Sequence, residues 1–276
     1  RRVAYAGRQG KHWSAVINDK VGSAFDKIGE ISFGPGGSVA YAAQRGPRWL
    51  MVVDDKQGEL YDQVSHPVFN SDGELAYVAK KGPDSFLVVG GEARGPYADI
   101  GSIAFDRANQ LVYSVKEDRQ WRITDGGEVM GPKFDEIYAL SVADDSTVSY
   151  VSRREQSRSV VREDVVGPQF DDVRNISGEN TGIAFGYAAK LNGKWQVVAN
   201  NATGPMFDAV DLLFSGPKAV PVYAAKQGTK WSVMVGEQRS PSFDSVWVYG
   251  FDQSGTRLVY GAMNKREMWR KVMTIQ

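Results

Sequence analysis

The chain has 276 residues, enough to bury a large core in one domain, and its 33 Lys and Arg balance its 33 Asp and Glu. This balance gives no reason to expect nucleic acid or an anionic membrane as a partner. The absence of cysteine excludes disulfides, thiolate metal sites and a cysteine nucleophile, and no apolar run approaches the ~18 residues of a membrane-spanning helix.

The sequence begins Arg1-Arg2, without a methionine and already inside a repeat. No signal peptide is present in it. We therefore expect a processed product or an excised fragment, with any targeting signal outside this sequence.

From its start the chain repeats one unit of 36 or 37 residues, marked by a tyrosine. The tyrosines are Tyr5, Tyr41, Tyr77, Tyr113, Tyr150, Tyr187, Tyr223 and Tyr260. Eight or nine residues later stand Trp13, Trp49, Phe86, Trp121, Arg158, Trp195, Trp231 and Trp269. A fixed period in this range indicates a repeat architecture.

Each unit contains four short segments, named A to D here, which alternate apolar and polar residues. Segment A ends in an apolar triplet such as 31–33, and a tight turn such as 34–37 leads to segment B, which carries the tyrosine. Segment C begins at the tryptophan, and segment D centres on Gly-Pro-x-Phe-Asp, as at 131–135, 167–171 and 204–208. The alternation and the β-branched and aromatic content predict strands, and the turn residues at 34–37 are typical of a hairpin.

Four short antiparallel strands per unit are the pattern of a β-propeller blade. We predict an all-β protein, a β-propeller of four-stranded antiparallel blades with about 36 residues per repeat, formed by residues 1–276 as a single domain. The repeated tyrosines and tryptophans are expected to pack between blades. An open solenoid fits the four-strand unit less well.

The number of blades is eight or seven, because segments B and C occur eight times but A and D seven times. Seven blades would use the first D segment, around residues 24–27, to complete the last blade and would leave 1–20 as a spare hairpin. Eight blades would use every hairpin and lack one A and one D strand. We favour eight, because a spare hairpin would expose an apolar edge.

The segment Asn-Ser-Asp-Gly-Glu-Leu-Ala-Tyr at 70–77 resembles the Ser-Pro-Asp-Gly-x-x-Ala-Tyr signature of bacterial WD-like propeller repeats, related to the periplasmic TolB propeller. Residues 52–55 and the Gly-Pro-x-Phe-Asp segments resemble a tandem variety of bacterial envelope proteins. The resemblance spans essentially the whole chain and implies the fold and a periplasmic or extracellular location, but no activity. The fifth unit departs from it at Arg158 and Gly178, so we expect an irregular ring there.

The sequence offers no catalytic constellation. His12 and His66 stand in different repeats without metal-ligand spacing, and Gly-x-Ser-x-Gly and phosphate-loop motifs are absent. The loop of Ser71, Asp72 and Gly73 is too short for a calcium-binding EF-hand. We therefore predict no catalytic residue, no metal and no cofactor.

The aspartate of segment D recurs as Asp26, Asp62, Asp99, Asp135, Asp171, Asp208 and Asp244. This repetition argues against catalysis, which needs one or two carboxylates in distinct environments. We expect these carboxylates to accept hydrogen bonds from backbone N–H groups instead.

The connections between segments B and C are consistently basic. Their cations are Arg8, Lys11, Arg45, Arg48, Lys80, Lys81, Lys116, Arg119, Arg153, Arg154, Arg158, Lys190, Lys194, Lys226, Lys230, Lys265 and Arg266. In a propeller these turns share one face, so they could form a basic ring that attracts an anionic partner. Alternatively, the aspartates between segments D and A share this face and pair with these cations.

The candidate binding residues are Arg153, Arg154, Arg158, Arg162, Lys80, Lys81, Arg45 and Arg48. The densest group belongs to the fifth unit, where an arginine replaces the tryptophan. These features favour a non-enzymatic binding or scaffolding protein of the bacterial cell envelope, with a protein or polyanionic glycan as partner. Two other hypotheses remain: a propeller hydrolase or lyase with its site in the central channel, and a structural or accessory propeller of a larger assembly.

Overall fold

The computed structural model describes residues 3–143, 145–177, 186–199, 202–217 and 220–275. The chain divides into two compact units, Arg1–Leu140 and Ser141–Gln276. Within the described ranges the strands form eight small antiparallel sheets, six with four strands and two with three. This confirms the predicted all-β class with about one sheet per repeat. No helix in the described part of the chain is long and apolar enough to cross a membrane.

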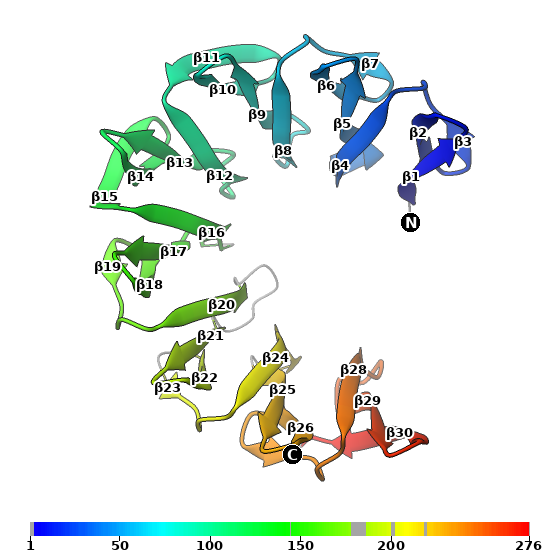
Figure 1. The fold of residues 1–276 in the computed structure, drawn as a ribbon, viewed down its shortest axis with the longest axis vertical. Helices are drawn as coiled ribbons and strands as arrows, with labels where there is room; N and C mark the ends of the chain where they lie inside the picture. The colour runs from blue at the N-terminus through cyan, green and yellow to red at the C-terminus, as the bar shows by residue number, and fades with distance from the viewer. Residues whose placement is uncertain (1–2, 144, 178–185, 200–201, 218–219, 276) are drawn as a thin grey trace. The chain divides into compact units, whose positions relative to one another are not determined.

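The first unit contains sheets one to four, which lie side by side in chain order (Figure 1). Sheet one is β1 (Ala4–Gln9), β2 (His12–Ile17) and β3 (Lys20–Val21). Sheet two is β4 (Lys27–Phe33), β5 (Val39–Arg45), β6 (Arg48–Val53) and β7 (Lys56–Gln57), with a 3-10 turn η1 (Pro35–Gly37). Sheet three is β8 (Gln63–Phe69), β9 (Leu75–Lys81), β10 (Asp84–Val89) and β11 (Glu92–Tyr97). Sheet four is β12 (Asp99–Phe105), β13 (Leu111–Glu117), β14 (Gln120–Asp125) and β15 (Glu128–Phe134).

The unit boundary falls within β16, the first strand of sheet five, and the remaining sheets belong to the second unit. Sheet five is β16 (Glu136–Val142), β17 (Val148–Arg154), β18 (Ser157–Arg162) and β19 (Val165–Val166). Sheet six is β20 (Asp172–Ser177), β21 (Gly186–Leu191), β22 (Lys194–Ala199) and β23 (Ala202–Thr203). Sheet seven is β24 (Ala209–Ser215), β25 (Pro221–Gln227), β26 (Lys230–Val235) and β27 (Gln238–Arg239). Sheet eight is β28 (Ser245–Phe251), β29 (Arg257–Asn264) and β30 (Glu267–Thr274).

The four-stranded sheets follow the predicted order A, B, C, D, with segment D shorter than expected. In several sheets D is a two-residue strand followed by one further backbone pair, such as Trp49 with Tyr61. Sheet one lacks an A strand and sheet eight lacks a D strand. The first D segment pairs inside its own sheet, through β3 with β2 and Phe25 with Trp13. This pairing supports eight sheets over the alternative that needed this segment for the last sheet.

The core lies between neighbouring sheets. The phenylalanine of segment D in one sheet meets the repeat tyrosine of the next, edge to face. These pairs are Phe25–Tyr41, Phe170–Tyr187, Phe207–Tyr223 and Phe243–Tyr260, with ring centroids 6.1–6.4 Å apart. Each such pair contributes about 0.5–1.5 kcal/mol beyond its buried area. The prediction that the tyrosines pack between sheets is confirmed for Tyr41, Tyr77, Tyr113, Tyr187, Tyr223 and Tyr260, and Tyr150 is buried, whereas Tyr5 in sheet one is 51% exposed.

The expected irregularity of the fifth unit is absent from the described residues of sheet five. Arg158 makes the same two backbone hydrogen bonds to Phe170 that Trp195 makes to Phe207, at 2.7–2.9 Å. The strand ladder uses only backbone groups at this position, so it tolerates the loss of the tryptophan. Gly178 lies outside the described residues.

Candidate binding surface at the B-to-C turns

The repeated aspartates stand where one sheet passes to the next, immediately before or at the start of an A strand. Several accept a hydrogen bond from a backbone N–H in the B-to-C turn of their own sheet. The pairs are Asp26 with Gly46 at 2.7 Å, Asp62 with Gly82 at 2.7 Å, Asp171 with Gly193 at 3.4 Å, Asp208 with Gly228 at 2.6 Å, and Asp244 with Lys265 at 2.5 Å. The structural role predicted for these carboxylates is confirmed at these five positions.

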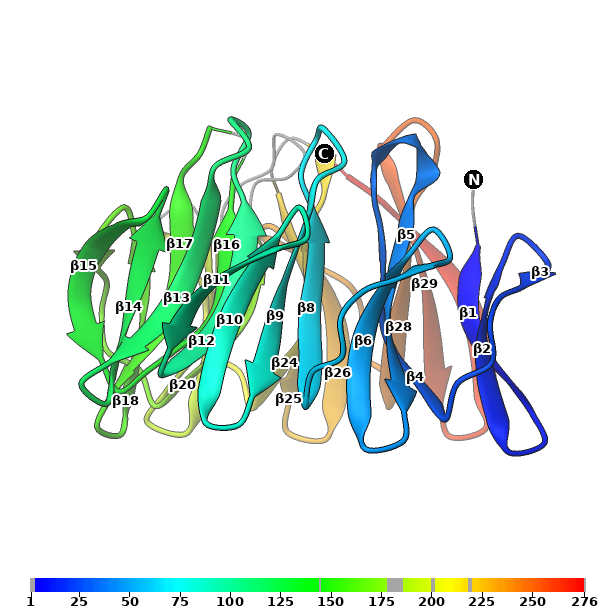
Figure 2. The same cartoon turned by 90° about the horizontal axis from the view of Figure 1, so that it is seen from above.

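Some of the same carboxylates also pair with a cation of the preceding sheet. Lys80 lies 2.8 Å from Asp99, Lys230 lies 2.6 Å from Asp244, and Lys194 contacts Asp208. Asp208 and Asp244 therefore each hold a turn in one sheet and a cation in its neighbour. Pairing of the basic turns with the D-to-A aspartates is thus confirmed here, and it neutralises part of the expected basic ring. Figure 2 shows the hairpins β1–β2, β5–β6 and β9–β10 of the first unit at one end of the sheets.

This arrangement predicts a loss of stability in acid. The hydrogen bond from Lys230, with that from the Lys265 N–H, holds the pKa of Asp244 below its ordinary value, and Lys194 and the Gly228 N–H do the same for Asp208. Because the folded pKa lies below the unfolded value of ~3.9, the contribution is complete above that value and is lost as the pH falls through the folded pKa. We expect the double variant Asp208→Asn/Asp244→Asn to unfold at lower urea than wild type at pH 6, with a smaller difference at pH 3.

The control for this experiment is Asp19→Asn in the exposed turn between β2 and β3, which is expected to leave the urea midpoint unchanged at both pH values. An equal shift of the double variant at pH 6 and pH 3 would contradict the proposed linkage. Both carboxylates are partly exposed, so their effect is further screened by salt.

Four of the repeat tryptophans carry a cation from segment B on one ring face. A basic residue near the end of segment B is the direct cross-strand neighbour of the tryptophan and lies over its ring. The pairs are Arg8 with Trp13, Lys116 with Trp121, Lys190 with Trp195 and Lys226 with Trp231, at 5.6–6.0 Å from the ring centroid. The tryptophans are mostly half-buried, with only Trp195 fully buried. Trp49 and Trp269 pack against the cores between neighbouring sheets as expected, and four other tryptophans use one ring face to hold a cation.

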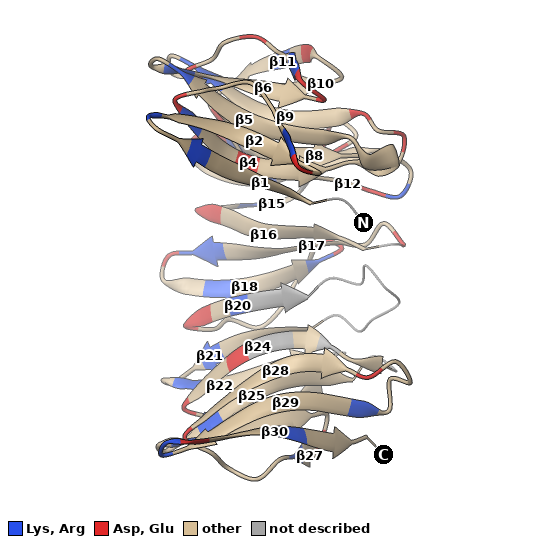
Figure 3. Cartoon of the chain, turned by 90° about the vertical axis from the view of Figure 1, so that its right-hand side faces the viewer, with Lys and Arg blue, Asp and Glu red and all other residues tan. Residues whose placement is uncertain are grey.

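Sheet five breaks this pattern. Its cross-strand pair is Arg153 and Arg158, so two guanidinium groups stand where sheets one, four, six and seven have a cation and an indole. Like charges directly opposite each other on a sheet are destabilising. Arg158 donates to the Asp171 carbonyl at 2.6 Å, and its Nε lies 3.5 Å from Asp172, while Arg153 donates to the Glu155 carbonyl at 2.9 Å. Figure 3 shows the basic residues at the adjoining ends of β17 and β18.

Arg174, which the sequence analysis did not single out, belongs to the same group. Its Nε lies 2.9 Å from Asp172, and its guanidinium carbon lies 4.8 Å from the ring centroid of Trp195. Asp172 is the cross-strand partner of Lys190, whose ammonium lies over that same tryptophan. Since Arg174 stands on an A strand, a search confined to B-to-C turns could not find it. We call Arg153, Arg154, Arg158, Arg174 and Lys190 the sheet-five cluster.

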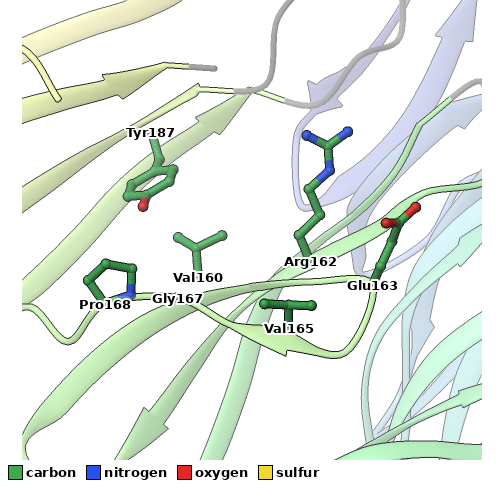
Figure 4. Close-up of a pocket in the computed structure, with 7 residues that line it drawn as sticks. All are labelled: Val160, Arg162, Glu163, Val165, Gly167, Pro168 and Tyr187. Carbon is green, nitrogen blue, oxygen red and sulfur yellow. The ribbon is translucent and has the colours of Figure 1, made fainter. Parts of the chain in front are cut away.

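Arg162 does not join this cluster, although it is close in sequence. It ends β18, and Arg158 stands near the start of the same strand, so the two occupy opposite ends. Arg162 lines a pocket of about 360 Å³ together with Val160, Glu163, Val165, Pro168 and Tyr187 (Figure 4). The predicted group of four arginines therefore separates into three at the B-to-C end and one at the C-to-D end.

The other predicted residues lie in sheets two and three. Arg45 donates to the Gln57 side chain at 2.9 Å and covers the ring of Phe25 at 5.6 Å. Lys80 forms its ion pair with Asp99 as described above. Arg48, at the start of β6, and Lys81, at the end of β9, are exposed. Of these four cations, Arg45 and Lys80 therefore make contacts within the chain.

Neither histidine belongs to a recognisable catalytic or metal group. His66 lies in β8 with φ of 56°, and its Nδ1 is 3.0 Å from the hydroxyl of Ser65. His12 starts β2 in sheet one and is exposed. Among the described residues no three His, Cys, Asp or Glu side chains are grouped so as to hold a metal ion.

No protein-family model matches the sequence, and no curated protein matches it. Solved β-propeller structures do match. The β-propeller domain of the Trilobed protease from Pyrococcus furiosus is 13% identical, with 90% of this chain and 97% of that chain covered and a TM-score of 0.45. Virginiamycin B lyase from Staphylococcus aureus is 11% identical, with 86% and 89% covered and a TM-score of 0.43.

A dihydro-heme d1 dehydrogenase is 13% identical, with 99% of this chain and 70% of that chain covered and a TM-score of 0.49. The matched proteins thus include a lyase, a protease domain and a dehydrogenase. A fold that carries such different activities indicates none of them for this chain.

Proposed function

We propose that this chain is a non-enzymatic binding or scaffolding β-propeller, formed as one domain, which engages an anionic partner through the sheet-five cluster. The observation that carries this proposal is the cross-strand pair of Arg153 and Arg158 at a position where four other sheets place a cation on a tryptophan. The pair lacks the stabilising contact between a cation and an indole ring, and it places two positive charges opposite each other on neighbouring strands. A sequence under selection for stability alone would not gain from this exchange.

The charge balance of the cluster supports an anionic partner. Around Asp172 the cations Arg158, Arg174 and Lys190 converge, and Arg153 and Arg154 extend the group along β17. The Asp172 carboxylate is shared by Arg158 and Arg174, so one negative charge faces two guanidinium groups. Arginine suits carboxylate and sulfate groups, because its planar fork donates two parallel hydrogen bonds.

The partner we favour is a polyanionic glycan or an acidic protein surface in the bacterial cell envelope. Three features support this proposal: the resemblance of residues 70–77 to WD-like and TolB-like repeats, the exposed guanidinium group of Arg174, which is 65% accessible, and the positive balance of the cluster. The location is periplasmic or extracellular in this proposal.

The first probe is a sulfated polysaccharide such as heparin, and the second is polyglutamate.

Removing the guanidinium groups of Arg153, Arg154 and Arg158 together by substitution with alanine is expected to weaken heparin binding at least tenfold and to reduce its salt dependence. Binding is measured by titration calorimetry at two salt concentrations. The matched control removes three exposed cations elsewhere, in the variant Lys11→Ala/Lys56→Ala/Arg266→Ala, with the same change in net charge. Equal losses in the two triple variants, or none in either, would refute the proposed site.

A further inference from the structure

A pocket of about 250 Å³ lies between sheets one and two, at the end of the sheets where strands C and D meet. Its lining includes Asn18, Lys20, Gly22, Asp54 and Asp55. The Asp54 carboxylate is already used, since it accepts a hydrogen bond from the Val39 N–H at 3.0 Å. The pocket thus has polar walls and lies within the first unit of the chain.

The hydroxyl group of Tyr41 lies beside this pocket. Tyr41 is completely buried, and its hydroxyl oxygen has no hydrogen-bond partner among the described protein groups. A buried hydroxyl without a partner is uncommon, because its desolvation is uncompensated. Burial raises the pKa of Tyr41, and the charge of Asp55 raises it further, so this group keeps its proton.

Gly22 leaves open the space between these two groups. A Cβ atom at Gly22 would lie 3.5 Å from the Tyr41 hydroxyl oxygen and 3.3 Å from Asp55 Oδ1. The two oxygens therefore flank the same small volume without forming a direct hydrogen bond. Gly22 is held in place by its own N–H, which donates to the Ala15 carbonyl at 2.9 Å.

The chemistry of the two oxygens defines what fits between them. The phenol has a proton to donate, and the ionised carboxylate of Asp55 can only accept. An ammonium group could not accept the phenol proton, and a carboxylate could not donate to Asp55. A hydroxyl group does both. We propose that the pocket at Gly22 is a binding site for a hydroxyl group, from water or from a small sugar or polyol, which accepts a hydrogen bond from Tyr41 and donates one to Asp55.

The sheets of the chain supply a matched comparison. Asp55 is the second residue of the turn between β6 and β7, with φ of 65°. Glu237 holds that place in sheet seven, whose repeat tyrosine is Tyr223. Burial alone raises the pKa of Tyr223, with no contribution from a neighbouring carboxylate. Tyr223→Phe is therefore the control for a buried tyrosine whose pKa is not raised by the carboxylate at the equivalent turn position.

The test is a double-mutant cycle between Tyr41→Phe and Asp55→Ala, followed by urea unfolding. If the hydroxyl bridge exists, Tyr41→Phe lowers the folding equilibrium constant about five- to tenfold, the size of one net hydrogen bond. The same change in the Asp55→Ala background has a smaller effect. If the phenol has no partner, Tyr41→Phe raises the folding equilibrium constant and shows no coupling to Asp55, and this result overturns the proposal.

Two further experiments test whether the gap at Gly22 is needed and whether water or a sugar hydroxyl fills it. Gly22→Ala, which fills the gap, is expected to abolish the coupling, whereas Tyr223→Phe is expected to show none with Asp55→Ala. Methyl glucoside is then added as a probe to wild type and to the Tyr41→Phe variant. Greater stabilisation of wild type identifies a sugar hydroxyl as the ligand, and equal stabilisation of both identifies water as the bridging group. If the coupling between Tyr41→Phe and Asp55→Ala persists in the Gly22→Ala background, the proposed hydroxyl site is contradicted.

Discussion

Replacement of Phe207 by alanine is expected to lower the free energy of unfolding by about 3–5 kcal/mol. Phe207 is 3% exposed and packs with Val197, Tyr223, Ala225 and Met234 in the core between sheets six and seven. Its ring meets that of Tyr223 edge to face at 6.1 Å. Its backbone hydrogen bonds to Trp195 remain in the variant, so the loss reports side-chain packing alone.

The neighbouring residue provides the control for this measurement. Met206 is 46% exposed on the same short segment, and Met206→Ala is expected to change the free energy of unfolding by less than about 0.5 kcal/mol. Urea unfolding is followed by tryptophan fluorescence and by far-ultraviolet circular dichroism. Similar small losses in both variants would mean that the D-segment phenylalanine does not hold neighbouring sheets together.

Replacement of Gly261 by alanine is expected to cost about 1–3 kcal/mol of unfolding free energy by overpacking. Gly261 in β29 is directly opposite Trp247 in β28, and the indole lies across it. A Cβ atom at Gly261 would lie 2.1 Å from two atoms of this ring. The alanine would force the indole away and strain its hydrogen bond from Nε1 to the Tyr249 hydroxyl, which is 2.6 Å long.

A second substitution separates this steric cause from a backbone effect. In a Trp247→Ala background the obstructing ring is absent, so Gly261→Ala is expected to cost little, and the two changes are strongly non-additive. Near-ultraviolet circular dichroism checks the indole position in each variant. Additive losses in the four-protein cycle would refute the contact as the reason for glycine at this position.

Much of the fold follows from the sequence because the repeat spacing and strand alternation act locally. Seven of the eight repeat tyrosines are buried, and five of the seven repeated aspartates accept a turn N–H, as expected of structural residues. Asp26, for example, accepts from the Gly46 N–H at 2.7 Å. The single-domain organisation stays a prediction, and the chain forms two compact units.

The candidate site was predicted less completely, because it depends on which end of a strand each side chain occupies. Arg158 and Arg162 are four residues apart in sequence and stand at opposite ends of β18. Arg174 joins the cluster from a different sheet through Asp172 and Trp195. No periodicity within one repeat shows such a contact between sheets. The pocket at Gly22 was missed for a similar reason, since Gly22 of sheet one lies beside Tyr41 and Asp55 of sheet two only after the two sheets pack.

The most direct test of the binding account restores the repeat residue with the variant Arg158→Trp. Arg153 can then stack on the introduced indole, as Lys226 does on Trp231, so the free energy of unfolding is expected to stay within about 1 kcal/mol of wild type or to rise. Heparin affinity, measured on the same preparation, is expected to fall several-fold. Unchanged heparin affinity in a folded Arg158→Trp variant would contradict the account, because the departure at sheet five would then serve no anionic partner.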